Sequence, residues 1–238
     1  MKFLLIAAVV IAAGPVRAGG DADSVRALTG LVGDGENFRG IPFGEVVLAT
    51  TGHRVIPVDP GNEDDRRLVA MLGPALDATL AALNSPESPA RKLARINEAS
   101  RLFEDELVNR INAFPGWACR PAPNAGGETQ RAGYPDLEIT DTQTGRVTYL
   151  DPKLYAAGSE ESSFRTFYYE PKTRTTKITR DARHLVAGIS HDARDGAWHF
   201  TGWRLTDLSG LMVRLKAEFQ ASNRDLYERP PVAQSGAR

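Results

Sequence analysis

The sequence predicts a mixed α/β fold, in which helices flank a central mixed β-sheet and a small hairpin and helix form an N-terminal extension. Three features support this prediction. An amphipathic stretch covers 88–113, a β-hairpin over 136–153 follows it, and two further β-prone stretches, 184–190 and 198–205, come later. With 238 residues, of which 42% are hydrophobic and 25% charged, the chain is long enough to bury a substantial core.

The N-terminal residues have the pattern of a signal peptide. Lys2 precedes the apolar run Phe3–Ala13, and Val16 and Ala18 are the small residues that signal peptidase requires before its cleavage site. We therefore expect residues 1–18 to be removed and the mature protein to be periplasmic or secreted. The apolar run is too short to span a bilayer, so no membrane association is expected after cleavage.

Residues 19–84 are expected to form the N-terminal extension. Glu45–Ala49 and His53–Val58, separated by a Thr-Thr-Gly turn, suggest a small hairpin. Leucines at helical spacing then predict a helix over 63–83, which Gly73-Pro74 interrupts.

Residues 85–229 are expected to form the main α/β domain. Ser88 is an expected N-cap and Pro89 suits the first turn of a helix that continues to about Ala113. The apolar stripe of this helix consists of Leu93, Ile96, Phe103, Leu107 and Ile111, with Ser100 among them.

Three segments complete the predicted domain after the hairpin and its neighbouring strands. Ser163–Tyr169 is aromatic and β-prone, although it could also begin a helix, and Leu211–Asn223 is expected to be an amphipathic terminal helix. Residues 230–238 are expected to be a disordered tail.

The hairpin has a register that the sequence itself predicts. Asp141 and Arg146 can pair across the loop 142–145, whose length is common in hairpins. Extending this register pairs Thr140 with Val147, Glu138 with Tyr149, and Asp136 with Asp151. Because side chains alternate along a strand, Asp136, Asp151 and Lys153 then share one face.

Two carboxylates that face each other across a hairpin repel, so a positive group is expected between them. Oxygen ligands favour a hard divalent cation, and we expect Mg²⁺ or Mn²⁺. Asp136 and Asp151 would be its ligands, and the carbonyl of Pro152 could add a third oxygen. Lys153 would orient or activate the attacking water in phosphodiester hydrolysis.

A further carboxylate is expected from the preceding helix, because that helix leads directly into the hairpin. Glu98 is the first choice for this catalytic carboxylate and Glu106 is the second.

With these residues in place, the chain resembles the PD-(D/E)xK nuclease superfamily, which has the restriction-endonuclease-like fold, over roughly 90–220. The resemblance rests on Pro135-Asp136, on Asp151-Pro152-Lys153 and on the acidic helix before them. It implies Mg²⁺-dependent cleavage of nucleic acid by a nuclease-like domain, with Asp136, Asp151 and Lys153 at the matching positions. The stretch from Trp203 to Asn223 also looks like type II restriction enzymes.

The sequence departs from the family pattern at Pro152, where an apolar residue is usual. Proline lacks a backbone donor and is confined to strand edges or bulges. Either the strand lies at an edge there, or the geometry of the site is distorted.

Substrate contacts are expected from basic residues interleaved with aromatic ones after the hairpin. Phosphate contacts and base stacking both suit this mixture, although aromatic side chains could equally fill the core while the basic ones are solvated. The residues chosen as substrate-binding are Arg165, Lys177, Arg180 and Arg183.

The composition and motifs exclude several classes of function. One cysteine, Cys119, permits no internal disulfide, and the scattered histidines lack the spacing of a zinc site. The sequence also lacks a nucleophile elbow, a phosphate-binding glycine loop and a paired-cysteine motif.

The sequence therefore predicts an exported, metal-dependent nuclease whose partner is nucleic acid, DNA rather than RNA. Two alternatives stay open: an inactive periplasmic binding or structural protein that keeps the nuclease-like fold, and a small-molecule phosphodiesterase. Nothing in the sequence specifies an oligomeric state.

Overall fold

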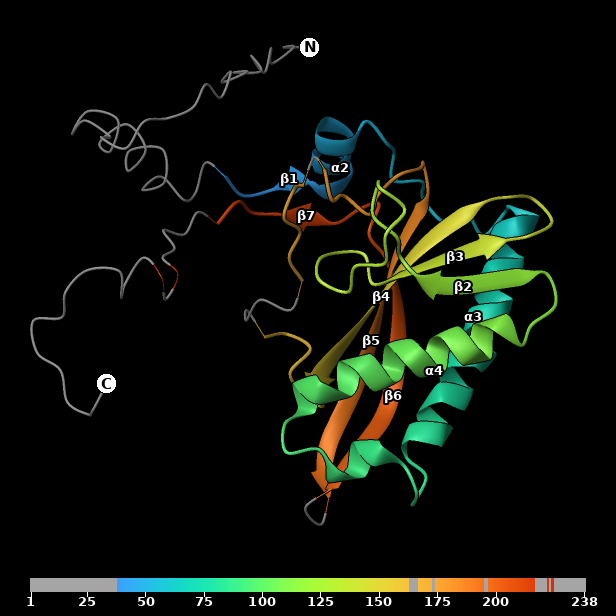
Figure 1. Ribbon diagram of the computed structural model, residues 1–238, viewed down its shortest axis with the longest axis vertical. Helices are drawn as coiled ribbons and strands as arrows, with labels where there is room; N and C mark the ends of the chain where they lie inside the picture. The colour runs from blue at the N-terminus through green and yellow to red at the C-terminus, as the bar shows by residue number, and fades with distance from the viewer. Residues whose placement is uncertain are drawn as a thin grey trace, which may run out of the picture. The chain divides into compact units, whose positions relative to one another are not determined.

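The computed structural model describes residues 38–162, 167–172, 174–194, 197–216, 222 and 224 (Figure 1). Residues 40–213 form one compact unit. The expected signal peptide, 1–18, and the expected tail, 230–238, lie outside the described residues. None of the described helices has the length and apolar character needed to cross a membrane.

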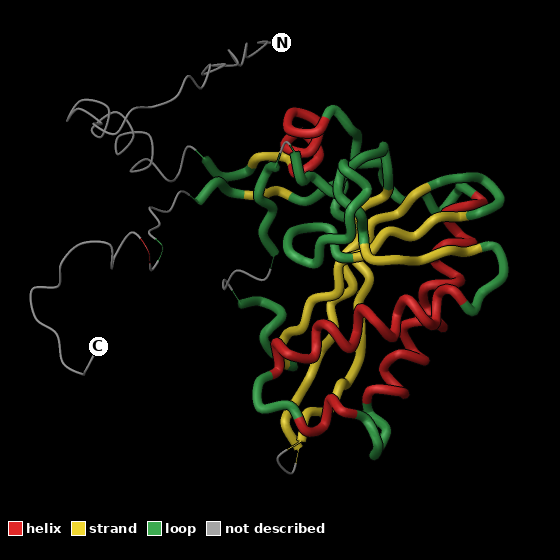
Figure 2. Tube along the Cα trace, in the orientation of Figure 1, coloured by secondary structure: helices red, strands yellow, loops and turns green. Residues whose placement is uncertain are grey.

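A five-stranded mixed sheet forms the centre of the compact unit (Figure 2). The strands lie in the order β2-β3-β4-β5-β6, and only β4 and β5 are parallel neighbours. They comprise β2 (Trp117–Pro121), β3 (Leu137–Asp141), β4 (Val147–Ala156), β5 (Arg183–Arg194) and β6 (Ala197–Asp207). A separate two-stranded pair joins β1 (Ile41–Pro42) to β7 (Met212–Val213).

Two helices, α3 (Glu63–Leu83) and α4 (Ser100–Asn112), pack on one face of this sheet and form the larger core. Asn62 caps α3 by accepting hydrogen bonds from two backbone amides of the first turn. The helix continues through Pro74, so the interruption expected there does not occur. The apolar side chains of α3 pack into the same core as the sheet residues Leu137 and Leu150.

The opposite face of the sheet carries the smaller core, to which α2 (Phe43–Thr51) contributes. The expected hairpin over Glu45–Ala49 and His53–Val58 is therefore wrong, because its first half is helical. Phe43 and Val47, four residues apart, are both fully buried on one side of α2, and this tertiary packing overrides the β preference of the local sequence. Gly52 ends the helix with a φ of 76°.

The predicted helix over 88–113 is only partly correct. Its beginning consists of two short 3₁₀ turns, η1 (Pro89–Lys92) and η2 (Ile96–Ala99), and the α-helix proper begins at Ser100. Ser88 does cap η1, as expected, by accepting from the amide of Ala90. The indole of Trp198, on β6, donates a hydrogen bond of 3.0 Å to the carbonyl of Leu93, which lies between the two 3₁₀ turns.

Two further predictions require correction. The terminal helix expected from Leu211 is wrong over its first residues, because Met212–Val213 is a strand that pairs with Ile41–Pro42; residues 217–221 and 223 lie outside the described part. The described residues of the β-prone stretch, 167–169, have no regular secondary structure.

The two later β-prone stretches, 184–190 and 198–205, lie within β5 and β6 as predicted, and these two strands pair antiparallel. A mixed sheet of five strands flanked by helices agrees with the predicted fold class and with a restriction-endonuclease-like core.

Candidate active site

The β3–β4 hairpin confirms the predicted register. Thr140 pairs with Val147 and Glu138 with Tyr149. The loop is closed by hydrogen bonds between Asp141 and Arg146 (2.9 Å, amide to carbonyl) and between Gly145 and Asp141 (2.8 Å). β3 begins at Leu137, so Asp136 lies one residue before its first paired position.

The hairpin brings Asp136, Asp151 and Lys153 together. The Lys153 Nζ atom lies 3.5 Å from Asp136 Oδ2 and forms an ion pair with Asp151 Oδ2. The side chain of Asp151 is 1% exposed, whereas those of Asp136 and Lys153 are 18% and 25% exposed. The site is therefore closed at Asp151 and open to solvent at the other two side chains.

The charges of these three residues influence one another strongly. Burial, followed by the nearby Asp136 charge, raises the pKa of Asp151 above its ordinary value. Burial disfavours the charge on Lys153, but Asp151 and Asp136 outweigh it and raise the pKa of this ammonium. Lys153 is thus held as a cation between two carboxylates. The buried one, Asp151, is costly to ionise unless a positive charge lies beside it.

Pro152 lies at a strand edge, one of the two possibilities that the sequence left open. β3 pairs with β4 only as far as Leu150, whereas β5 accompanies β4 through Ala156. Pro152 is therefore flanked by β5 alone among the described strands, and this is a setting in which proline is tolerated.

The carboxylates expected from the preceding helix do not lie as predicted. Glu98 lies in η2 and pairs with Arg95 at 3.0 Å, and Glu106 pairs with Arg110 at 2.6 Å within α4. Glu104 is the α4 carboxylate that interacts electrostatically with Asp136: burial and then Asp136 raise its pKa. The sequence analysis missed Glu104, although it immediately follows the buried Phe103 of the apolar stripe.

Comparison with known proteins decides the family. The model of the type II restriction enzyme MjaV family matches residues 36–230. The chain belongs to this family. The type II restriction enzyme MjaV of Methanocaldococcus jannaschii is 29% identical over 199 residues, which cover 79% of this chain and 86% of that protein.

A second similarity covers a smaller part of a larger protein. An uncharacterized ABC transporter ATP-binding protein of Mycobacterium tuberculosis is 24% identical over 146 residues. These cover 61% of this chain but only 38% of that protein.

The four basic residues expected to bind substrate lie in different settings in this MjaV-family chain. Arg165 lies outside the described residues, and Arg180 is exposed. Lys177 is 2% exposed, so the expectation that it contacts a substrate at the surface is wrong. Its ammonium donates instead to backbone carbonyls next to the site.

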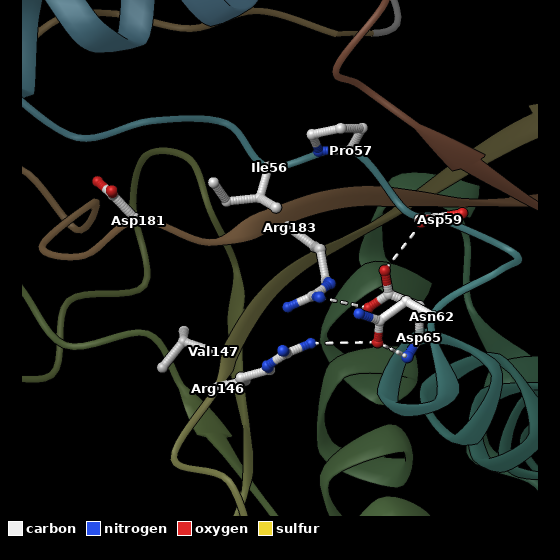
Figure 3. A pocket seen from close by; sticks show the side chains of 9 residues that line it. All are labelled: Ile56, Pro57, Asp59, Asn62, Asp65, Arg146, Val147, Asp181 and Arg183. Atoms are coloured by element: carbon white, nitrogen blue, oxygen red, sulfur yellow. Dashed lines mark hydrogen bonds and ion pairs between the residues drawn. The ribbon is translucent and has the colours of Figure 1, made fainter.

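Arg183 also departs from the prediction, because it is buried in an ion pair with Asp65 on α3. It stands three residues before Val186, which pairs with Asp151, so its side chain lies on the opposite face of the sheet. Arg183 and Arg146 line a cavity of about 460 Å³ near the first turn of α3. Figure 3 shows both side chains directed toward Asn62 and Asp65. No side chain of the Asp136–Asp151–Lys153 group lines this cavity.

A divalent cation fits the residues at the hairpin site of the MjaV-family chain. Asp151 Oδ1 is buried and has no hydrogen-bond partner among the described residues, and a second carboxylate lies beside it. No group of three or more His, Cys, Asp or Glu in the described part is arranged to hold a metal. Mg²⁺ commonly takes only one or two carboxylates and completes its shell with water and phosphate oxygens, so this donor set is sufficient.

Proposed function

We propose that this chain is a Mg²⁺-dependent endonuclease that hydrolyses phosphodiester bonds of DNA, with a site of the PD-(D/E)xK type. The observation that carries the proposal is the meeting of Asp136, Asp151 and Lys153 at the end of the β3–β4 hairpin. Membership of a restriction enzyme family supports DNA as the substrate. Mn²⁺ is expected to replace Mg²⁺, since both prefer oxygen ligands.

The residues divide the chemistry of hydrolysis among them. Asp136 and Asp151 would hold the cation, the Pro152 carbonyl could add a third oxygen, and Glu104 adds negative charge beside Asp136. The bound cation would supply Lewis-acid activation of the phosphoryl group and of water. Water adds to phosphorus and one P–O ester bond breaks, which leaves a phosphomonoester on one product and a hydroxyl on the other.

Lys153 has the position that a water-orienting or charge-stabilising group requires. Its ammonium is fixed by the two carboxylates, and a quarter of its side chain is exposed, so it can reach a substrate oxygen without moving far. Stabilising charge that develops in the transition state is worth most when the donor is already in place. Arg180, which is exposed, is the described basic residue proposed to contact the DNA backbone.

We propose that the mature protein is exported and begins after Ala18. The support is the leader pattern of residues 1–18, which precede the family match at residue 36. Mass spectrometry of the protein recovered from the periplasm would show the mass of the chain from Gly19, and a full-length mass there would contradict the proposal.

Cleavage of supercoiled plasmid DNA tests the activity. We expect nicked or linear products with Mg²⁺ or Mn²⁺, none with EDTA, and none from Asp151→Ala or Lys153→Ala variants that remain folded. Glu106→Gln is the matched control, because this carboxylate pairs with Arg110 on α4. Wild-type activity in both site variants would refute the proposal.

The same assay separates the alternatives. Hydrolysis of the chromogenic substrate bis(p-nitrophenyl) phosphate without plasmid cleavage would favour a small-molecule phosphodiesterase. A folded protein that binds neither Mg²⁺ nor Mn²⁺ in calorimetry and cleaves neither substrate would favour the inactive binding protein.

A further inference from the structure

Lys177 is an unusual lysine, because its ammonium is buried and fully hydrogen-bonded to backbone. The residue is 2% exposed. Its Nζ donates to the carbonyls of Gly133 (2.8 Å), Pro135 (2.9 Å) and Arg131 (3.3 Å). An ammonium has three protons and no acceptor, so these three bonds use its whole capacity.

All three acceptors belong to one short loop, 131–135, and the next residue is Asp136. Carbonyls that converge on one cation would repel each other without it. The left-handed backbone of Gly133, with a φ of 87°, supplies the turn that this loop requires. The carboxylate of Asp136 therefore extends from a loop whose backbone is bound to Lys177.

The segment that carries Lys177 is itself attached on both sides. The amide of Ala125 donates to the carbonyl of Thr176 at 2.8 Å. The amide of Thr179 donates to the hydroxyl of Tyr149 at 3.0 Å, and Tyr149 lies on β4 two residues before Asp151. Lys177 thus connects the loop before one site carboxylate to the strand that carries the other.

The positive charge of Lys177 interacts with the carboxylates of the site. Burial lowers its pKa, and the charges of Asp136, Glu104 and Asp151 act in the opposite direction. In the proposed function, Asp136 and Asp151 hold the cation and Glu104 adds negative charge beside Asp136.

We propose that Lys177 is a positioning residue of this site, whose ammonium fixes the loop 131–135 so that the Asp136 carboxylate meets Asp151 and Lys153. It would act through Asp136 and would not touch the DNA. This inference rests on the proposed function for its effect on catalysis, but the hold on the loop is independent of activity.

The first test is Lys177→Met, which keeps the length of the side chain and removes the charge and the three hydrogen bonds. We expect kcat for plasmid cleavage to fall at least tenfold, because small misplacement of a reacting group is costly. We expect KM, and the Kd for DNA measured without divalent ions, to stay within about twofold. We expect the salt dependence of binding to stay unchanged, since no phosphate contact is lost.

The second readout needs no catalysis. Hydrogen exchange followed by mass spectrometry should show faster exchange of peptides covering 131–136 in Lys177→Met, while peptides of α3 keep their protection. If the wild type cleaves neither substrate, the proposed function fails, yet this measurement still decides the role of Lys177.

Lys172→Met is the matched control for charge. Its ammonium pairs with Glu170 at 3.4 Å and lies close enough to Lys177 to lower its pKa. Removing this second cation should leave both kcat and loop exchange within about twofold of the wild type. An equal loss of kcat in both variants would overturn the proposal, because charge and not hydrogen bonding would then explain the effect.

Other outcomes would also overturn it. A weaker Kd and a salt slope reduced by about one, with kcat unchanged, would make Lys177 a phosphate contact. If Lys177→Met does not fold, Lys177→Gln retains two donors and takes its place. Failure of both to unfold cooperatively would show that Lys177 supports the whole core and not this site.

Discussion

The Asp151–Lys153 pair allows a quantitative test of how the site is held. Lys153→Met would leave Asp151, 1% exposed, as a buried carboxylate next to Asp136. At the 3.5 Å between Lys153 Nζ and Asp136 Oδ2, the Coulomb attraction is about 5 kcal/mol with an effective dielectric constant of about 20. Desolvation offsets much of this, and removing one member of a buried pair typically costs about 3–5 kcal/mol.

Since a quarter of the Lys153 side chain is exposed, we expect the lower end of that range, a loss of about 3 kcal/mol of unfolding free energy. Asp151→Asn alone should be close to neutral, because it also removes the repulsion from Asp136. The double variant Lys153→Met/Asp151→Asn leaves no unpaired charge at position 151. It should therefore recover about 2 kcal/mol of the loss.

Urea unfolding of the four proteins, followed by circular dichroism at pH 9 without divalent ions, measures this cycle, because the pKa of Asp151 is raised to about 8 and its carboxyl group must be ionised for the test. All three variants should lack plasmid cleavage. Strictly additive free energies, or a Lys153→Met variant within about 0.5 kcal/mol of the wild type, would refute the reasoning.

Three other predictions follow from burial and charge. Glu104→Gln should lower kcat about tenfold in plasmid cleavage while Glu106→Gln does not, and equal effects would remove Glu104 from the site. Burial raises the pKa of Cys119 to about 12, so native protein should resist iodoacetamide at pH 8 and react only in urea; fast native labelling would contradict this. Burial lowers the pKa of His184 to about 3. The unfolded chain, with a pKa near 6.5, then binds more protons, so stability should fall by about 2 kcal/mol from pH 6.5 to 5, with a shallower loss in His184→Gln. Equal slopes in urea unfolding would show that His184 is not responsible.

The features that the sequence predicted well are local ones. A hairpin has few possible registers once its loop is chosen, so the pairing of Glu138 with Tyr149 follows from Asp141 and Arg146. The same register places Asp136, Asp151 and Lys153 on one face without any knowledge of the rest of the chain.

Helical periodicity could have identified Glu104 as the carboxylate that α4 places near the site. An α-helix turns about 100° per residue, and the buried side chains of α4 are Phe103, Leu107 and Ile111. Measured around the helix axis from the centre of this buried stripe, Glu104 lies about 60° away and Glu106 about 100° away. Glu98 would lie about 180° from that centre even in a continuous helix. The stripe therefore favoured Glu104, whereas proximity in the chain to the hairpin did not discriminate between the three.

Other features could not be read from the sequence, because distant contacts decide them. α2 has the residues of a strand, but the burial of Phe43 and Val47 against the sheet makes it helical. Lys177 has the composition of a surface residue, and only the convergence of three carbonyls explains why it is buried. Arg183 was expected at the surface for the same reason, and Asp65, on a helix far away in the chain, pairs with it inside.

The edge position of Pro152 has a consequence for association between copies of the chain. Beyond Leu150, one flank of β4 has no strand partner in the described part of the molecule, and such flanks can add a strand from another polypeptide. Proline offers no amide to an incoming strand, and the charge of Lys153 beside it further disfavours such pairing. The two residues that shape the site would thereby also protect an unpaired sheet edge from aggregation.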